Sequence, residues 1–443
     1  MNEFDTLIHN GVVVTVNPEN QIIPDGMLGI SGDKIALVTQ REENVPLPRA
    51  LNRIDARGGI ILPGLVNTHT HLPMSLFRGL ADDLPLEVWL NEHIFPAEAE
   101  HIHPESVRIG TLLSCVELLL AGTTTCCDGY FLEDQVAAAV AETGIRAVLG
   151  QGVVDFPAPG VPDPALNVST AAGFVRKWSG RCETITPSIF CHSPYTCCPD
   201  TLVAAKAAAA EAGVLFQIHA AETRGEAGMI VDPKGSSPIA HLDELGILDQ
   251  HTLLVHAVWA DDMDIHRLQL RRACISHNPD SNMKLAAGVA PVPQYLTAGL
   301  CVGLGTDGCA SNNNLDMFQE MDMAAKLHKV YALDPVLMPA ESVLRMATLN
   351  GARAIGLDSL TGSLETGKLA DVVVVDTRST HLTPMYHPVS HLVYAACGSD
   401  VRHVFVGGRH LVSNGSVTTV DTGSLLDAVN TFCDGITTQR SNP

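Results

Sequence analysis

Two histidines separated by one residue stand at the end of a short apolar segment near the start of the sequence. His69 and His71 follow residues 61–66, a run with the length and composition of a buried β-strand. Side chains two positions apart on a strand point to the same side. Two buried imidazoles that converge in this way are costly without a partner, and a metal ion suits them. We therefore take His69 and His71 as candidate metal ligands.

Two residues far away in the sequence have side chains that bind the same kind of ion. His219 ends one apolar segment, and Asp307 follows another. Three imidazoles and one carboxylate, with a position left open for water, suit a catalytic zinc ion. Such an ion lowers the pKa of its water to about 7. We expect one divalent metal ion held by His69, His71, His219 and Asp307, most simply Zn²⁺, with Fe²⁺ or Mn²⁺ as alternatives.

A glutamate and a further histidine complete the candidate catalytic groups. Glu222 follows His219 by three residues, and a carboxylate there can take a proton from attacking water and pass it to a substrate nitrogen. His256 ends the next apolar segment and either orients or deprotonates the water or joins the metal ligands; the spacing leaves both roles open. Asp307 can also accept a hydrogen bond from the water. We expect Glu222, His256 and Asp307 to be catalytic.

The segments that carry these residues alternate with helical patterns. Helical patterns at residues 104–121 and 200–212 are two examples. Eight strand–helix units predict a (β/α)8 barrel of the TIM type, whose functional residues stand at the carboxyl ends of the strands. The eight candidate strands are residues 61–66, 123–128, 146–154, 184–191, 214–219, 252–256, 273–276 and 301–304.

The residues at the end of the fourth candidate strand bear on the number of metal ions. A second ion would need a bridging anionic ligand, commonly a carbamylated lysine at that place. The sequence has Phe190, Cys191 and His192 there and no lysine. The sequence therefore favours one metal ion over two.

The two ends of the chain have a different pattern from the middle. Residues 1–60 and 366–443 contain short apolar runs separated by turns, such as the Gly-Asp-Lys turn at residues 32–34, which is typical of a hairpin. We expect the two ends to form one small β-sandwich domain, and residues 61–365 to form the metal-dependent catalytic barrel.

Composition excludes several classes of partner. The net charge of −22 and the absence of a basic run argue against nucleic acid. No uninterrupted apolar run approaches the roughly 20 residues that a membrane helix needs. The first residues lack the pattern of a signal peptide, and the 12 scattered cysteines form no Cys-x-x-Cys pair. We expect an enzyme of the cytoplasm with reduced cysteines and no membrane partner.

The motifs named above, taken together, resemble those of the amidohydrolase superfamily. The resemblance extends to the Gly-Lys-Leu-Ala-Asp sequence at residues 367–371 and so covers nearly the whole chain. It implies a mononuclear aminohydrolase, in which activated water attacks an amidine-like ring carbon and ammonia leaves. The motifs that carry it are Pro63 to His71, His219 to Glu222, His256, Ser276 to Pro279, and Gly305 to Gly308.

Within this superfamily, several segments are similar to the 5′-methylthioadenosine/S-adenosylhomocysteine deaminases. These segments are residues 72–86, 89–90, 95–98 and 192–195. The resemblance implies that the substrate is 5′-methylthioadenosine, S-adenosylhomocysteine or adenosine, which is converted to the inosine analogue with release of ammonia. It also implies that Glu98 binds the ribose hydroxyls, that His192 contacts the nucleoside and that Trp89 forms part of the pocket wall.

One departure from these relatives concerns the amino-acid tail of S-adenosylhomocysteine. Some relatives place an arginine after the third strand, where it can pair with the tail carboxylate. This sequence has Gln151 in that stretch, and glutamine cannot form a charged bidentate pair. We therefore expect 5′-methylthioadenosine or adenosine to be preferred, unless another arginine, such as Arg176, approaches.

Two other functions remain open from the sequence. The nearer alternative is a deaminase of a free base (guanine, 8-oxoguanine or cytosine) or a triazine hydrolase on the same scaffold. The more distant alternative is a barrel that has lost catalysis and serves as a binding protein. Such a barrel would lack metal ligands or Glu222, and this sequence has all of them. From the family we also expect a homo-oligomer.

Overall fold

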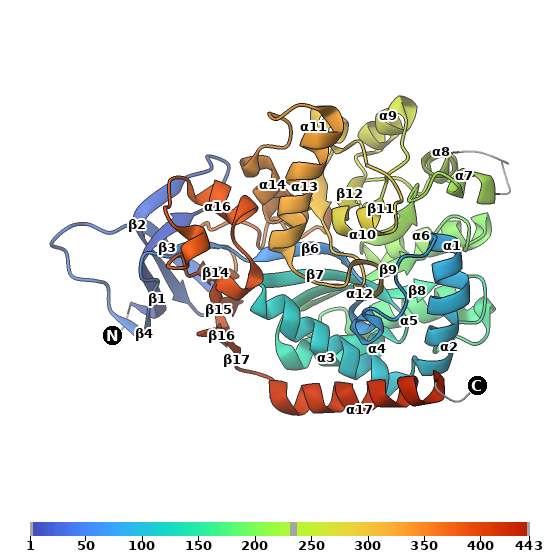
Figure 1. The fold of residues 1–443 in the computed structure, drawn as a ribbon, viewed down its shortest axis with the longest axis horizontal. Helices are drawn as coiled ribbons and strands as arrows, with labels where there is room; N and C mark the ends of the chain where they lie inside the picture. Colours follow the sequence, from blue (N-terminus) through green and yellow to red (C-terminus); the bar gives the residue numbers. More distant parts are fainter. Residues whose placement is uncertain (1–2, 231–236, 441–443) are drawn as a thin grey trace.

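The structure is a computed structural model, and it describes residues 3–230 and 237–440. The middle of the chain forms an eight-stranded parallel sheet, and both ends together form a second, mixed sheet of nine strands (Figure 1). The eight parallel strands follow one another in chain order, as expected for a barrel. They are β6 (Leu65–Thr70), β7 (Thr123–Tyr130), β8 (Arg146–Val153), β9 (Ile185–Cys191), β10 (Phe216–Ala220), β11 (Thr252–His256), β12 (Cys274–His277) and β13 (Val302–Leu304).

The barrel nearly closes between its first and last strands. Strand β13 lies beside β6, and just beyond it the Asp307 N–H donates to the His69 carbonyl at 3.0 Å. Every residue of these two strands is buried. The predicted barrel with a small β-domain made from both chain ends is therefore confirmed.

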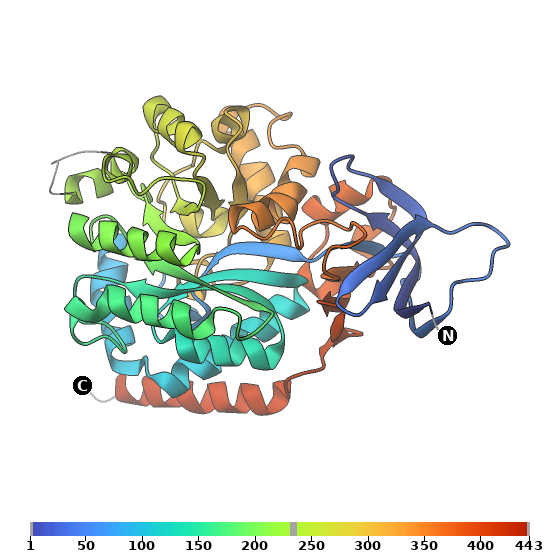
Figure 2. The same ribbon diagram turned by 180° about the vertical axis from the view of Figure 1, so that it is seen from behind.

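Helices surround the barrel on its outer side (Figures 1 and 2). Helix α6 begins with Pro199 and ends at Gly213, which adopts a positive φ of 65°. Proline in the first turn and a left-handed glycine just after the last are the usual signals for these two ends. The main helices of the barrel are α3 (Pro104–Leu120), α4 (Glu133–Thr143), α5 (Asn167–Trp178), α6 (Pro199–Ala212), α8 (Pro238–Glu244), α9 (Asp262–Arg271), α11 (Val292–Thr297), α13 (Met317–Ala332), α14 (Ala340–Met346) and α15 (Leu349–Ala354).

Short helices stand at the end of the barrel where the strands finish. These helices carry or border the residues of the candidate site, because they directly follow strands or the loops between them. They are α1 (Leu86–Val88), a π-helical turn (Trp89–Ile94), α2 (Phe95–His101), α7 (Glu226–Met229), α10 (Pro279–Lys284) and α12 (Cys309–Asn312).

The small domain is one connected sheet to which both ends of the chain contribute. Its order is β17-β16-β15-β14-β5-β1-β2-β3, and β4 pairs with β1. Buried aliphatic side chains such as Ile8, Leu28 and Val374 form a core with Phe405. The strands are β1 (Phe4–Val14), β2 (Ile22–Ser31), β3 (Lys34–Gln40), β4 (Ala50–Asp55), β5 (Ile60–Pro63), β14 (Val372–Val375), β15 (Val401–Val406), β16 (Arg409–Ser413) and β17 (Ser416–Val417).

The first predicted barrel strand, residues 61–66, is wrong in its extent. Its first half is β5, which pairs with β14 and β1 in the small sheet, and only after Gly64 does the chain enter β6 of the barrel. A Cβ atom at Gly64 would lie 1.9 Å from the Thr124 hydroxyl oxygen, so only glycine fits this passage. One apolar run serves two sheets, and hydrophobicity alone does not show the change.

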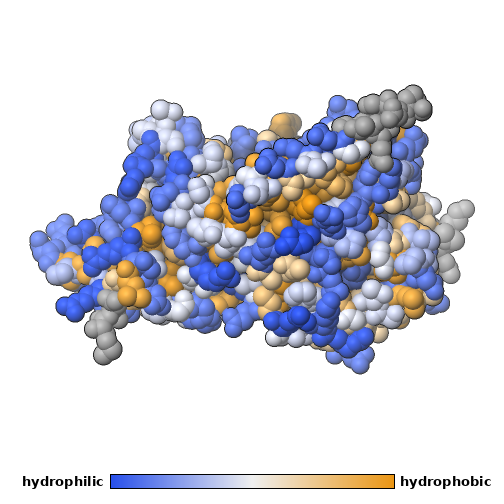
Figure 3. Space-filling model, turned by 90° about the horizontal axis from the view of Figure 1, so that it is seen from below, coloured by the Kyte–Doolittle hydropathy of each residue, from blue (hydrophilic) through white to orange (hydrophobic). Residues whose placement is uncertain are grey.

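Helix α17 (Thr422–Arg440) leaves the small sheet and lies along the underside of the barrel, against α3 (Figure 1). Its Leu425, Val429 and Ile436 are buried. Seen from below, the molecule shows an apolar strip between hydrophilic areas (Figure 3). The division of the chain into a β-domain (residues 1–60 and 366–443) and a barrel domain (residues 61–365) stays a prediction. Helix α17 falls in the β-domain by its sequence position, but it packs on the barrel.

A buried ion pair joins the two parts. The Arg146 guanidinium, at the start of β8, donates two hydrogen bonds of 2.9 and 3.1 Å to the carboxylate of Asp371, which precedes β14. The same carboxylate accepts from the Gly407 N–H at 2.7 Å. Paired in this way, the two charges tie the barrel to the small sheet at the end away from the strand carboxyl termini.

Within residues 3–230 and 237–440, no helix combines the length and the apolar character needed to cross a bilayer.

Candidate active site

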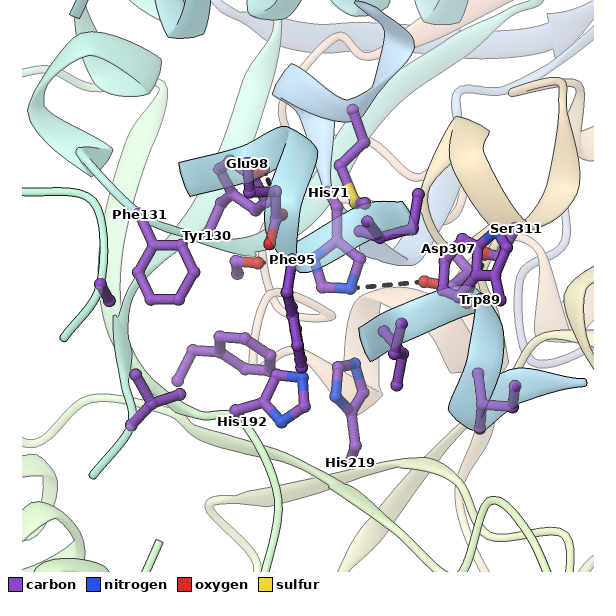
Figure 4. A pocket seen from close by; sticks show the side chains of 18 of the residues that line it. His71, Trp89, Phe95, Glu98, Tyr130, Phe131, His192, His219, Asp307 and Ser311 are labelled. Atoms are coloured by element: carbon purple, nitrogen blue, oxygen red, sulfur yellow. Dashed lines mark hydrogen bonds and ion pairs between the residues drawn. The ribbon is translucent and has the colours of Figure 1, made fainter. Parts of the chain in front are cut away.

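A cavity of about 340 Å³ opens at the carboxyl end of the barrel strands. Functional residues of such barrels gather at this end, because the loops there follow the strands directly. His71, His219 and Asp307 line its floor, and Glu98, Tyr130 and Phe131 line one side (Figure 4). Of the residues predicted for the site, only His69 does not line the cavity, and it lies directly beneath, in contact with His219 and Asp307.

The four predicted metal ligands have their donor atoms close together. His69 Nε2 lies 3.1 Å from His219 Nε2 and 3.2 Å from Asp307 Oδ1, and His71 Nε2 lies 3.4 Å from Asp307 Oδ1. Four ligands at tetrahedral angles around a zinc ion are about 3.3 Å apart. These three spacings match such a site, and His69, His71 and Asp307 form one group whose donor atoms all lie within 4.8 Å of one another. His69, His219 and His256 form a second overlapping group of three, so the geometry leaves a ligand role for His256 open.

The protonation states of these side chains suit metal binding. Burial lowers the pKa of His69 to about 4 and holds that of His219 well below its usual value. Burial alone would raise the pKa of Asp307, but its bond with His69 and the neighbouring imidazoles hold it well below the usual range. His71 Nδ1 lies 2.6 Å from the Gly129 carbonyl, to which it donates. His69 and His219 therefore each offer a lone pair, and Asp307 offers a charge.

Asp307 is held by hydroxyl groups on the side away from the histidines. Ser281 Oγ and Ser311 Oγ donate to its Oδ2 at 2.7 and 2.9 Å, and the Gly308 N–H donates to its Oδ1 at 2.8 Å. These bonds fix the plane of the carboxylate, so that Oδ1 faces His69 and His71.

Glu222 and His256 are neighbours in the lining of the cavity. His256 Nε2 lies 3.8 Å from Glu222 Oε1. On the other side of the ring, His256 Nδ1 contacts Asn282 Oδ1 at 3.0 Å and Asn278 Nδ2 at 3.2 Å, which fixes the orientation of the ring. Burial raises the pKa of Glu222, while His256 lowers it. A carboxyl group with a raised pKa can carry a proton in both directions near neutral pH.

A second buried glutamate positions the loop that carries Glu222. Glu226, in α7, accepts from the Glu222 N–H at 2.8 Å. Burial raises the pKa of Glu226 to about 8. It contacts the backbone of Glu222 rather than the cavity, so it is a positioning residue.

Glu98 stands on the side of the cavity opposite Asp307 (Figure 4). The Tyr130 hydroxyl donates to Glu98 Oε1 at 2.5 Å. Burial raises the pKa of Glu98 to about 7, and the bond from Tyr130 works against this rise. One carboxylate oxygen remains for a ligand, because Tyr130 occupies the other.

His192 and Trp89 also line the cavity, in agreement with their predicted place at the site. His192 Nδ1 lies 3.0 Å from Thr196 Oγ1, and its ring stands edge-on to that of His219, with 5.2 Å between centroids. Trp89 Nε1 donates to the Ala81 carbonyl at 3.0 Å, which fixes its indole among other buried apolar residues.

Several residues of the site are absent from the sequence-based set. Tyr130 escapes it because the second strand was expected to end at residue 128, whereas β7 continues to Tyr130. Ser281, Asn282 and Ser311 lie on short helices after the seventh and eighth strands, and no local pattern marks them. Gln151 does not line the cavity; its Oε1 accepts from the Glu133 N–H at 3.2 Å.

Comparison with known proteins agrees with the geometry. Residues 60–411 match the Amidohydrolase family. A 5-methylthioadenosine/S-adenosylhomocysteine deaminase of Syntrophobacter fumaroxidans is 45% identical over 425 residues, 96% of this chain and 97% of that protein. A 5′-deoxyadenosine deaminase of Methanothermobacter thermautotrophicus is 46% identical over 365 residues, 82% of this chain and 84% of that protein.

A solved structure extends the comparison to three dimensions. The crystal structure of an adenosine deaminase from Xanthomonas campestris with bound zinc superposes with a TM-score of 0.95 at 35% identity, covering 98% of this chain and 99% of that one. The similarity spans both the barrel and the small sheet. The chain belongs to the amidohydrolase family.

Proposed function

We propose that this enzyme removes the amino group of adenine nucleosides by hydrolysis, which yields the inosine analogue and ammonia. The observation that carries the proposal is the shared cavity. Metal-donor atoms and Glu222 lie at one end of it, and the buried carboxyl group of Glu98 lies at the other. The relatives named as deaminases of 5-methylthioadenosine, S-adenosylhomocysteine and 5′-deoxyadenosine support the same substrate class.

His69, His71, His219 and Asp307 would hold one divalent ion, and we propose zinc. The bound zinc in the similar adenosine deaminase structure supports this choice, and the nitrogen and oxygen donors also suit iron(II) or manganese(II). When bound, the ion supplies Lewis acidity that lowers the pKa of the attacking water.

The side chains around the water would then move its protons. Asp307 stays ionised and accepts a hydrogen bond from the water, and this hydrogen bond orients the water molecule. Glu222 takes a proton from the water and delivers it to the ring nitrogen beside the carbon that bears the amino group. Without that proton, addition to the ring would build charge on an unassisted nitrogen. His256, fixed by its two asparagine neighbours, orients the water from the side of Glu222.

The remaining predicted residues would bind the nucleoside. The free oxygen of Glu98 accepts from the ribose hydroxyls, and His192 contacts the nucleoside. Trp89 forms part of the apolar wall around it. Each of these three side chains lines the same cavity as Glu222, which supports their assignment to one substrate.

A panel of substrates tests the proposal. The purified metal-loaded enzyme is incubated with adenosine, 5′-methylthioadenosine, guanine, cytosine and a chlorotriazine, and ammonia and product are measured. We expect deamination of the two nucleosides. Activity confined to the free bases or to the triazine would contradict the proposal, and so would a protein without any activity that retains a full metal content.

We further propose that the enzyme works in the cytoplasm as a homo-oligomer. The eleven cysteines from Cys115 to Cys397 are free thiols, which supports a reducing compartment. Exposed apolar side chains gather at the end of α13, namely Val330, Tyr331, Leu333 and Val336, and such groups often mark contacts between protein chains. Sedimentation equilibrium measures the assembly state, and a monomer at micromolar concentration would contradict this part.

A further inference from the structure

Apart from its histidines and the metal ion proposed above, the ionisable groups that line the proposed nucleoside cavity are acidic. Three carboxyl groups line it, those of Glu98, Glu222 and Asp307. Among the described residues, no lysine or arginine lines it. Any anionic group of a substrate would therefore enter without a cationic partner and would face acidic side chains.

The part of the cavity beyond Glu98 is apolar. In Figure 4, Tyr130 and Phe131 lie on the side of Glu98 away from Asp307. The segment after β8 also lines the cavity, and in it Phe156 packs near Phe95 with 6.0 Å between ring centroids. With the adenine amino group at Asp307 and the ribose at Glu98, the 5′ substituent extends toward this apolar wall of the cavity.

The arginines that could approach this wall are placed elsewhere. Arg176 lies on an exposed position of α5 and does not line the cavity. Arg224 lies 5.5 Å over the ring of Trp259, at the border of a separate hollow. Gln151, at the position where some relatives carry arginine, is buried and bonded to the backbone at Glu133 and Gly152.

We infer that this enzyme selects adenine nucleosides whose 5′ substituent is uncharged and apolar, such as 5′-methylthio or 5′-deoxy, and discriminates against a tail that carries a carboxylate, such as the zwitterionic tail of S-adenosylhomocysteine. The inference rests on the proposed function. An apolar substituent gains from contact with Phe131, Phe156 and their neighbours. A carboxylate placed there loses its hydration without gaining a bidentate partner.

Four substrates separate charge from length. These are 5′-deoxyadenosine, 5′-methylthioadenosine, S-adenosylhomocysteine and 5′-butylthioadenosine, whose uncharged tail has nearly the length of homocysteine. We expect kcat/KM of S-adenosylhomocysteine to be lower than that of 5′-methylthioadenosine by roughly 100-fold or more, because a carboxylate is left unpaired. The butylthio compound should remain within about tenfold of 5′-methylthioadenosine.

The outcomes distinguish this inference from the proposed function. If none of the four compounds is deaminated, the proposed function fails. If S-adenosylhomocysteine reacts within tenfold of 5′-methylthioadenosine, the proposed function stands and the inference is overturned. If the butylthio compound is as poor as S-adenosylhomocysteine, length and not charge governs selection, and the inference is overturned as well.

A charged variant tests whether this wall faces the tail. Phe156 is 38% exposed, so the substitutions Phe156→Arg and Phe156→Gln leave the core intact. Both remove the aromatic ring, but only the first adds a cation that can pair with a carboxylate. We expect the ratio of kcat/KM for S-adenosylhomocysteine over 5′-methylthioadenosine to be about tenfold higher in Phe156→Arg than in Phe156→Gln. Equal ratios in the two variants would overturn the assignment of this wall to the 5′ tail.

Discussion

Replacing Glu222 with glutamine removes the proposed proton carrier and changes little else. Glutamine has the same shape but cannot take up a proton at neutral pH. A positioned acid–base group contributes about 10²–10⁴-fold, which is about 2.7–5.4 kcal/mol of barrier at 1.36 kcal/mol per tenfold. The Glu222 side chain is only 12% exposed, so bulk water is a poor substitute. We therefore expect kcat to fall by about 10³–10⁴-fold, the upper part of that range.

The assay must separate loss of chemistry from loss of metal. Glu222 does not belong to either group of donor atoms, so the metal content of Glu222→Gln should equal that of the unchanged enzyme. Elemental analysis of the purified variant measures this, and a discontinuous ammonia assay measures kcat with saturating 5′-methylthioadenosine.

Glu226 supplies a matched control. It is buried four residues further along and bonds to the backbone of Glu222, and its pKa of about 8 leaves it mostly neutral at pH 7. Glutamine resembles that neutral form and keeps an oxygen for the Glu222 N–H. We expect Glu226→Gln to stay within about tenfold of the unchanged enzyme. A metal-loaded Glu222→Gln with nearly full turnover, or equal losses in the two variants, would refute the proton-carrier role.

Three further changes test the metal site, the ribose contact and the link between the two sheets. His219→Ala removes one imidazole donor, and elemental analysis should find most of the metal lost; a variant with full metal content would remove His219 from the ligand set. Burial raises the pKa of Glu98 to about 7, so the stronger, ionised acceptor forms as the pH rises. KM for nucleosides should therefore fall as the pH rises through this range, and a bound cation would move the midpoint of this change to lower pH. The Glu98→Gln variant should lose this pH dependence of KM. If the variant kept the same pH profile of KM, Glu98 would be excluded as the group that causes it. Arg146→Met leaves Asp371 buried without its partner, which should cost about 3–5 kcal/mol of unfolding free energy in urea titrations; a loss below about 1 kcal/mol would show that the pair contributes little.

The strands that carry the site could be predicted because each is a short apolar run followed by a polar residue. His219 and His256 stand at the ends of β10 and β11. The bounds predicted for these two strands lie within two residues of the observed bounds. Strands covered on both faces are apolar throughout, so they stand out against the helices between them. The same property explains the error at residues 61–66, where two strands of different sheets follow each other with no polar residue between them.

The residues that orient the site could not be predicted, because their contacts join distant parts of the chain. Tyr130 bonds to Glu98, and Ser281 bonds to Asp307, across 32 and 26 residues. A serine or a tyrosine has no spacing rule that links it to such a partner, whereas two histidines on one strand have one. Only the folded barrel brings these pairs within hydrogen-bonding distance.

The backbone at the site shows why closure of the barrel and assembly of the metal ligands are one event. Asp307, His256 and Ala221 have positive φ values of 62°, 72° and 55°, a conformation that costs a non-glycine residue about 1–3 kcal/mol. Each of these residues lies at or just after the end of a strand. The N–H of Asp307 donates to the carbonyl of His69 where β13 meets β6, so the bond that closes the barrel also turns Asp307 Oδ1 toward His69 Nε2. The strain at Asp307 is held by this closure, and a chain that failed to close its barrel would lose the carboxylate from the ligand set together with that strain.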